Sequence, residues 1–251
     1  MTPNLLILAG TTEATQLART VADRNIKGTV SFAGRVDRPI RQPLPQRVGG
    51  FGGTAGLAAY IRAQAITHVI DATHPFAGQM SRNAILACAQ AHIPLVALTR
   101  APWQAQTGDQ WTHVPDITAA VATLDRPAQR VMLAVGRMHL AEFAPNPHHF
   151  YLLRLVDPPK TPLPLPNTHV VVDRGPFTVE NDQALMIKHG IDVVVSKNAG
   201  GSGAAAKITA ARHLDLPVIM INRPPIPQRA EVYSIDAVFD WLDHTGTDRG
   251  V

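Results

Sequence analysis

The sequence has 251 residues, of which 45% are hydrophobic and only 5% aromatic, and a formal net charge of +4. This length allows one large or two small globular domains, and the single cysteine, Cys88, excludes a disulfide framework or a cysteine metal site. The arginines are scattered, no apolar run is long enough to span a membrane, and no secretory signal is found. The sequence therefore predicts a cytoplasmic protein that binds neither nucleic acid nor membrane.

The chain opens with an apolar strand at residues 4–9 that runs into a helix at 12–24. The turn between them and the first helical residues are predicted to bind a cofactor: Gly10, Thr11, Thr12 and Glu13. A helix N-terminus carries N–H groups without partners and partial positive charge, so it binds anions. The dinucleotide fingerprint G-x-G-x-x-G is incomplete, so we expect the two threonines to contact the phosphates. A threonine-capped turn that binds nothing is the alternative.

Apolar runs then alternate with helical segments, which indicates a parallel α/β sheet. We expect strands at 28–33, 67–71 and 94–98 and helices at 54–65 and 77–91. Ligands of such sheets lie beyond the carboxyl ends of the strands, so the residues after each strand are the candidates for binding.

Arg35 follows the second strand, where a Rossmann-like unit meets the ribose of its cofactor. An arginine at this place favours the 2′-phosphate of NADPH over NADH, although a solvated surface arginine is the alternative. Four glycines occur within residues 49–53, and we expect Gly52, Gly53 and Thr54 to form a pocket wall, with Thr54 as the helix cap. A flexible hinge is the alternative for this loop.

Thr73, His74 and Pro75 follow the strand at 67–71. Pro75 is expected in the first helical turn, with Thr73 or His74 as the cap. In the usual strand order this turn lies next to the nicotinamide end of a cofactor, so all three are candidate cofactor contacts. His74 is also the candidate catalytic residue, because a histidine can donate or relay a proton. A capping or packing role is the alternative.

A second set of elements follows a transitional stretch at 100–130 that is interrupted by proline and glycine. We expect strands at 131–135, 149–155, 169–173, 192–196 and 217–221, and helices at 138–143, 178–189, 203–213 and 235–243. The sequence therefore predicts an α/β protein of two Rossmann-like domains with mainly parallel sheets and a cleft between them. The expected domains are residues 1–115, which would bind NADPH, and residues 116–251.

A glycine-rich turn after the strand at 192–196 is the candidate anion site of the second domain. Its predicted substrate contacts are Lys197, Asn198, Gly200, Gly201, Ser202 and Lys207. Arg137 and Arg223 follow two other strands of the same domain and are candidates for the same role. Each arginine alone is more often a surface residue, but their coincidence at three strand ends favours binding. No metal site is expected.

Several segments resemble the precorrin-6A reductase family of cobalamin biosynthesis. They are Ile-Leu-Ala-Gly-Thr-Thr-Glu-Ala at 7–14, Asp-Ala-Thr-His-Pro-Phe-Ala at 71–77, Ser-Lys-Asn-Ala-Gly-Gly at 196–201, Gly-Arg at 136–137 and Asn-Arg-Pro at 222–224. The resemblance implies two Rossmann-like domains and NADPH-dependent reduction of a carbon–carbon double bond in the precorrin-6A macrocycle, which gives precorrin-6B. The sequence departs from the family pattern at Ala9, where glycine is frequent, and at Ala199, where serine is frequent.

The resemblance also implies a large polycarboxylate substrate, which scattered arginines and lysines suit. Transient contact with other enzymes of the corrin pathway is a further expectation. The proton for the reduction could come from His74, another side chain or water, and the sequence leaves open whether the substrate carries cobalt. Two other functions stay open: a non-catalytic NADP(H)-binding sensor, and a transferase that uses a nucleotide-activated donor.

Overall fold

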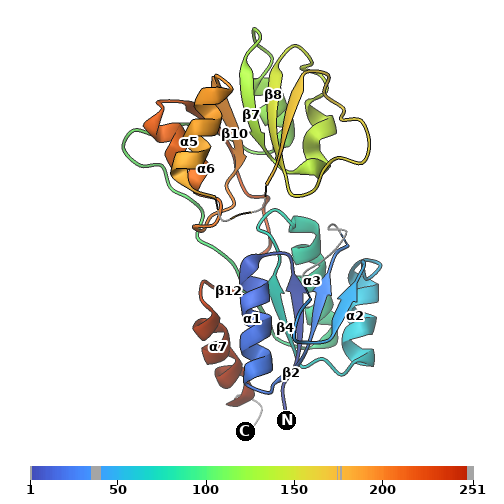
Figure 1. Cartoon of the computed structure of the whole chain (residues 1–251). Coiled ribbons are helices and arrows are strands. Elements are labelled where there is room, and N and C mark those ends of the chain that lie inside the picture. Colours follow the sequence, from blue (N-terminus) through green and yellow to red (C-terminus); the bar gives the residue numbers. More distant parts are fainter. Residues whose placement is uncertain (1, 35–40, 174, 176, 248–251) are drawn as a thin grey trace. The chain divides into compact units, whose positions relative to one another are not determined.

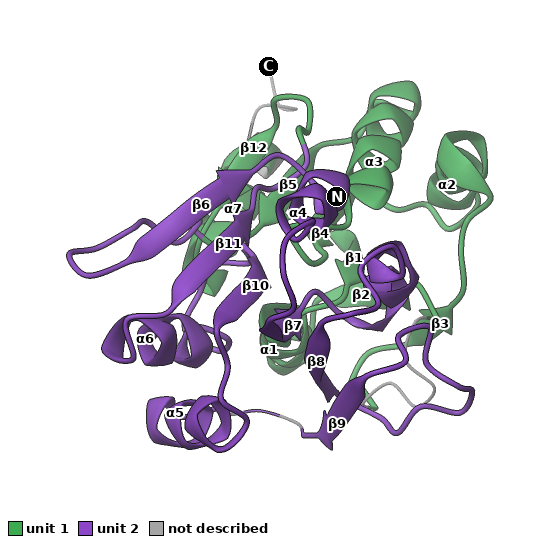
Figure 2. Cartoon of the chain, turned by 90° about the horizontal axis from the view of Figure 1, so that it is seen from above, with its two compact units in different colours: residues 1–100, 225–251 green, residues 101–224 purple. Residues whose placement is uncertain are grey.

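The computed structural model describes residues 2–34, 41–173, 175 and 177–247. The chain forms two compact units, one of residues 1–100 and 225–251 and the other of residues 101–224 (Figures 1 and 2). Each unit holds one sheet of six parallel strands with helices beside it. The predicted α/β class with two parallel sheets is therefore confirmed.

The first sheet has the strand order β3-β2-β1-β4-β5-β12. Its strands are β1 (Asn4–Ala9), β2 (Lys27–Phe32), β3 (Gln46–Val48), β4 (His68–Ala72), β5 (Leu95–Leu98) and β12 (Ala230–Val232). This is the doubly wound order of dinucleotide-binding folds, in which the chain moves outward in both directions from the centre. The order reverses between β1 and β4, which therefore form the switch point of the first sheet.

The apolar opening strand β1 is buried on both faces, which explains its continuous run. Alternate residues point to opposite faces of a strand. Leu5 and Ile7 pack with helices α1 (Thr12–Asp23) and α7 (Ile235–Thr247). Leu6 and Leu8 pack with helices α2 (Gly53–Ala63) and α3 (Gly78–Ala91) on the other face. The first sheet is thereby enclosed by two helical layers.

The second sheet has the order β6-β11-β10-β7-β8-β9, with its switch point between β10 and β7. Its strands are β6 (Gln110–Val114), β7 (Arg130–Ala134), β8 (Phe150–Leu155), β9 (Thr168–Val172), β10 (Val193–Lys197) and β11 (Pro217–Ile221). Helices α5 (Val179–Lys188) and α6 (Ala206–His213) pack on its core, and α4 (Ile117–Thr123) packs on β11 and on the 3₁₀ helix η1 (Arg137–Phe143).

The structure corrects the expected domain boundary between residues 115 and 116 in two places. Residues 101–115 belong to the second unit, because β6 pairs with β11. Residues 225–251 return to the first unit, because β12 pairs with β5 and α7 packs against α1. The expected helix at 138–143 is a 3₁₀ helix, and the sequence reading missed β3, β6, α4 and β12. Among the residues described, no helix is long and apolar enough to cross a membrane.

Candidate functional site

The turn after β1 carries the predicted cofactor contacts of the first unit. Thr11 caps helix α1, because its Oγ1 accepts a hydrogen bond from the backbone N–H of Ala14 at 3.2 Å. The same hydroxyl donates to the carbonyl oxygen of Ala72 at 2.9 Å, which ties the end of β1 to the end of β4. In the part of the chain that the structure describes, no acceptor pairs with the backbone N–H of Thr11 or Thr12. The groups available to an anion are thus backbone N–H donors, because the Thr11 hydroxyl is already hydrogen-bonded to Ala14 and Ala72.

Glu13 lies in the first turn of α1 and forms an ion pair with Arg100, just after β5. Arg100 Nε donates to Oε1 at 2.7 Å, and Nη2 donates to Oε2 at 2.5 Å. Burial by itself would raise the pKa of Glu13, but the hydrogen bonds and charge of Arg100, together with hydrogen bonds from the Glu13 backbone and Thr11, lower this pKa below its usual value. The predicted cofactor contact is therefore a charged group that fixes the start of α1 to β5.

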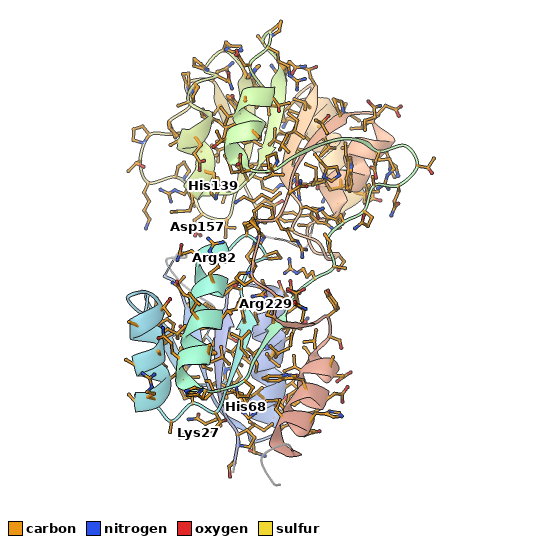
Figure 3. All side chains as sticks on the ribbon, turned by 180° about the vertical axis from the view of Figure 1, so that it is seen from behind. Lys27, His68, Arg82, His139, Asp157 and Arg229 are labelled. Atoms are coloured by element: carbon orange, nitrogen blue, oxygen red, sulfur yellow. The ribbon has the colours of Figure 1, made fainter. Side chains whose placement is uncertain are left out.

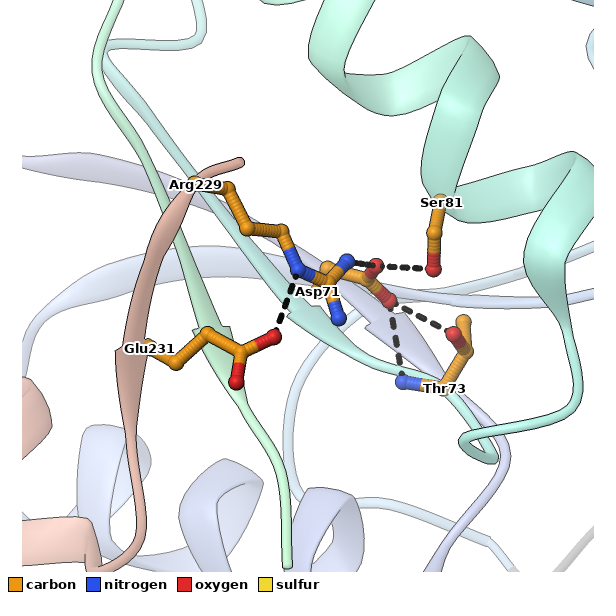
Figure 4. Close-up of polar contacts among 5 residues, drawn as sticks. All are labelled: Asp71, Thr73, Ser81, Arg229 and Glu231. Atoms are coloured by element: carbon orange, nitrogen blue, oxygen red, sulfur yellow. Dashed lines mark hydrogen bonds and ion pairs between the residues drawn. The ribbon is translucent and has the colours of Figure 1, made fainter. Parts of the chain in front are cut away.

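The turn after β4 is built on the buried carboxylate of Asp71 (Figure 4). One oxygen, Oδ1, accepts from the backbone N–H of Thr73 at 3.1 Å and from its hydroxyl at 2.6 Å. The other oxygen, Oδ2, accepts from Ser81 Oγ at 2.6 Å and from Arg229 Nη1 at 2.5 Å. Arg229 also donates from Nε to Glu231 at 3.2 Å.

Arg229 marks the carboxyl edge of the first sheet. Figure 3 shows it at the opposite end of that sheet from Lys27 and His68, which begin β2 and β4. Sequence reasoning missed both Asp71 and Arg229. The available signal was an aspartate within the apolar run of a buried strand, which needs a partner when it is buried.

His74 accepts a hydrogen bond at Nδ1 from the backbone N–H of Phe76 at 3.2 Å. This bond assigns the proton of the neutral ring to Nε2. Helix α3 begins at Gly78, with Ala77 at its N-cap and no side-chain cap. The expectations that Thr73 or His74 caps the helix and that Pro75 lies in its first turn are therefore wrong. The Thr73 hydroxyl donates a hydrogen bond to Asp71, and Pro75 lies in the turn before the helix.

The turns after β1 and β4 are in contact. A Cβ atom on Gly10 would lie 3.5 Å from the backbone nitrogen of His74 and 3.7 Å from the Cα of Thr73. The structure thus brings Gly10, Thr11, Thr73 and His74 together at the switch point of the first sheet.

The glycine-rich loop before α2 uses left-handed backbone at Gly52, with φ of 79°, and at Gly53, with φ of 81°. These angles require glycine. Gly52 is the N-cap and no side chain caps this helix, so the expectation that Thr54 caps it is wrong. Thr54 Oγ1 instead donates to Asn83 Oδ1 at 3.3 Å.

Arg47, which sequence reasoning missed, holds this loop from β3. Its guanidinium donates to the carbonyl oxygens of Gly49 at 2.9 Å and Gly50 at 3.0 Å, and lies 3.8 Å from the centroid of the Phe51 ring. Arg35, the predicted 2′-phosphate contact, lies outside the described residues.

In the second unit, the predicted substrate residues cluster around the loop at 198–205, which joins β10 to α6. Gly200 has a φ of 69°, and a Cβ there would lie 2.2 Å from the carbonyl oxygen of Ala101. Gly201 follows with a φ of 72°. Within the described residues, no acceptor pairs with the backbone N–H groups of Gly200, Gly201, Ser202, Gly203 or Ala204. Such a row of donors before a helix is an anion-binding arrangement.

Long-range side-chain contacts hold this loop in place. Asn198 accepts from the backbone N–H of Trp103 at 2.8 Å and donates to its carbonyl at 3.0 Å. Trp103 Nε1 donates to the carbonyl of Gly201 at 2.8 Å. Arg223 donates to the carbonyls of Asn198 and Ala199 at 3.0 and 3.1 Å. Asn198 and Arg223, predicted to bind substrate, thus stabilise the loop that carries the free donors.

The cationic residues predicted for the second unit differ in exposure. Lys207 is 9% exposed; its Nζ donates to the carbonyl of Ala204 at 2.7 Å and lies 4.9 Å from the centroid of the Trp103 ring. Burial lowers the pKa of Lys207 to about 8. Lys197 is half-buried at the end of β10, and Arg137 is exposed after β7. Throughout the described ranges, no group of three His, Cys, Asp or Glu residues is arranged to hold a metal.

Comparison with known proteins agrees with the resemblance found in the sequence. The family described as "Precorrin-6x reductase CbiJ/CobK" matches residues 4–243. A "Precorrin-6A reductase" of Rhodobacter capsulatus is 56% identical over 98% of this chain and 99% of its own length. Another from Sinorhizobium sp is 42% identical over 96% of this chain and 93% of its own.

A solved structure, "CobK precorrin-6A reductase", covers 99% of this chain and 100% of its own, with a TM-score of 0.93 and 55% identity. The strand order, the joined turns at the first switch point and these matches lead to one conclusion: the chain belongs to the precorrin-6x reductase CbiJ/CobK family.

Proposed function

We propose that this chain is an NADPH-dependent oxidoreductase that reduces a carbon–carbon double bond of precorrin-6A to give precorrin-6B. Family membership and the names of the relatives support the reaction. The observation that carries the proposal is the joining of the Gly10 and Thr73–His74 turns at the switch point of the first sheet. Open α/β sheets bind nucleotide cofactors at this place.

The first unit would hold the cofactor through its carboxyl edge. The N–H groups of Thr11 and Thr12 at the start of α1, which have no partner among the described residues, fit a pyrophosphate. The loop with Gly52 and Gly53 would form a wall of the same site. For the 2′-phosphate of NADPH we propose Arg35, which follows β2 in the sequence, and Arg47, which pairs in register with Ser31 near the end of β2. When bound, NADPH supplies the hydride.

The reduction also needs a proton, and we assign it to His74. Because Nδ1 accepts from the Phe76 N–H, Nε2 is the ring nitrogen that we assign to proton transfer. The imidazolium form would give one proton to the substrate and return to the neutral ring, which would regain a proton from water. His74 lies in the turn beside Gly10, at the edge where the reacting end of the cofactor would be bound.

The second unit would bind the carboxylates of precorrin-6A. The N–H row of the loop at 198–205 and the charge of Lys207 are suited to one carboxylate, and Lys197 and Arg137 to others. We place the reaction in the cytoplasm, where the product would pass to another enzyme of the corrin pathway by transient contact.

The direct test is to mix the purified protein with NADPH and precorrin-6A and to follow the absorbance of NADPH. We expect consumption of NADPH only when precorrin-6A is present, and slower consumption of NADH. Binding of NADPH without any consumption would contradict the proposal and favour the non-catalytic sensor.

A further inference from the structure

Both oxygens of the Asp71 carboxylate are hydrogen-bonded to groups of the first unit. Its two oxygens accept four hydrogen bonds, from the Thr73 N–H, the Thr73 hydroxyl, Ser81 and Arg229, and its side chain is 1% exposed (Figure 4). A carboxylate whose two oxygens are both hydrogen-bonded inside the protein is not free to bind a ligand. It does determine the conformation of the residues that donate to it.

The two oxygens have different partners. Oδ1 accepts both hydrogen bonds from Thr73, which folds the chain after β4 into a turn that places His74 next to Gly10. Oδ2 accepts from Ser81 on α3 and from Arg229, which lies just before β12. Arg229 therefore keeps the carboxylate oriented so that its other oxygen faces Thr73.

We propose that Asp71 is a positioning residue, oriented by Arg229, that holds the Thr73–His74 turn in the conformation that binds the nicotinamide cofactor. This inference rests on the proposed function. It adds two residues that act through the turn and do not need to touch the cofactor.

The substitution Asp71→Asn tests the inference because it removes one acceptor oxygen and changes little in volume. Arg229 offers only donors, so the amide oxygen of the variant would turn toward the guanidinium. The amide NH₂ would then face the N–H of Thr73, and the turn would lose its acceptor. We expect the Kd for NADPH, measured by fluorescence titration, to rise by about tenfold or more.

A second variant, Asp71→Asn with Arg229→Met, separates positioning from general stability. Without the guanidinium, the amide oxygen can return to Thr73 while the NH₂ donates to Ser81 Oγ. We expect the NADPH affinity to recover to within about threefold of the wild type. Failure to recover in a folded double variant would overturn the role assigned to the turn.

Asp109→Asn is the matched control in the second unit. Asp109 is likewise 1% exposed, pairs with Arg212 at 2.9 Å and accepts from the backbone N–H of Gln106 at 2.7 Å. We expect Asp71→Asn and Asp109→Asn each to lower the melting temperature, and Asp109→Asn to leave the NADPH affinity unchanged. An Asp71→Asn protein that is folded and binds NADPH like the wild type would refute the inference. A wild-type protein that does not bind NADPH would instead refute the proposed function.

Discussion

His74 is the residue on which the proposed chemistry depends most. His74→Asn keeps an acceptor for the Phe76 N–H but removes the ring that carries the proton on Nε2. We expect kcat to fall by about a hundredfold or more, a larger effect than the loss of NADPH affinity that follows from removing a cofactor contact. The matched control is His92→Asn, because His92 ends α3 with a φ of 55°, a conformation that asparagine adopts readily. Full activity in the His74 variant would show that the proton comes from elsewhere.

Gly200 is the glycine with the strictest steric requirement in the second unit. In Gly200→Ala, the new methyl group would lie 2.2 Å from the Ala101 oxygen and 2.5 Å from Arg223 Nη2, at a φ of 69°. We expect a loss of about 2 kcal/mol or more in the free energy of unfolding, measured by denaturant titration. Gly203→Ala, with nothing within 4 Å of its added Cβ, is the control and should unfold like the wild type. Equal stability of the two variants would contradict this account of the loop.

Sequence patterns predicted the turns that the chain forms better than the contacts of the side chains within them. Glycine and threonine at the end of an apolar strand predicted the turn at Gly10 and Thr11, because these signals are local. The partners of Asp71 and Asn198 could not be predicted, since Arg229 and Trp103 lie far away in the chain. Asn198 was expected to bind a ligand but is hydrogen-bonded to Trp103 within the fold. Such a partner comes close only in the folded chain, so the sequence does not show it.

At the scale of elements, the loop at 198–205 and helix α6 should bind anions in a way that depends on pH. Burial lowers the pKa of Lys207 to about 8, so its ammonium group loses its proton as the pH rises through that value. A bound carboxylate favours the charged form. We therefore expect the affinity for precorrin-6A, followed by tryptophan fluorescence, to fall above about pH 8.

Substitution of the lysine separates this effect from titration elsewhere. Lys207→Met should bind precorrin-6A more weakly and lose the decrease above about pH 8. Lys188→Met removes the same charge from the exposed end of α5 and should keep the wild-type profile. The same decrease in the Lys207 variant would show that another group titrates.

The strands that the sequence reading missed share a physical reason. Strands β3 and β12 have three residues each, and β6 has one fully buried position. All three lie at sheet edges, where alternation and apolar runs are weak. The central strands were found because burial on both faces imposes a continuous apolar run.

At the scale of the whole molecule, the first unit depends on both ends of the chain. Residues 225–251 supply β12, Arg229 and helix α7, whose Val238, Phe239 and Leu242 are buried with α1 in one core. We expect a fragment of residues 1–115 to lack cooperative thermal unfolding and NADPH binding. A fragment of residues 101–224, which holds all six strands of the second sheet, should unfold cooperatively. A stable fragment 1–115 that binds NADPH would contradict this division.

Three prolines, Pro224, Pro225 and Pro227, mark the return of the chain to the first unit. A rigid turn alone does not show that the strand after it pairs with β5, so this boundary was not predicted. Proline and glycine between residues 100 and 130 correctly indicated a transition there. They could not show that β6 pairs with β11, about a hundred residues later along the chain.

The central claim is that the first unit binds NADPH at the joined turns of β1 and β4. A crystal structure of the protein with NADP⁺ tests it most directly. We predict the pyrophosphate on the N–H groups of Thr11 and Thr12 and the nicotinamide beside Thr73 and His74. A dinucleotide bound at the loop of residues 198–205, with the turn at Gly10 left empty, would contradict the account.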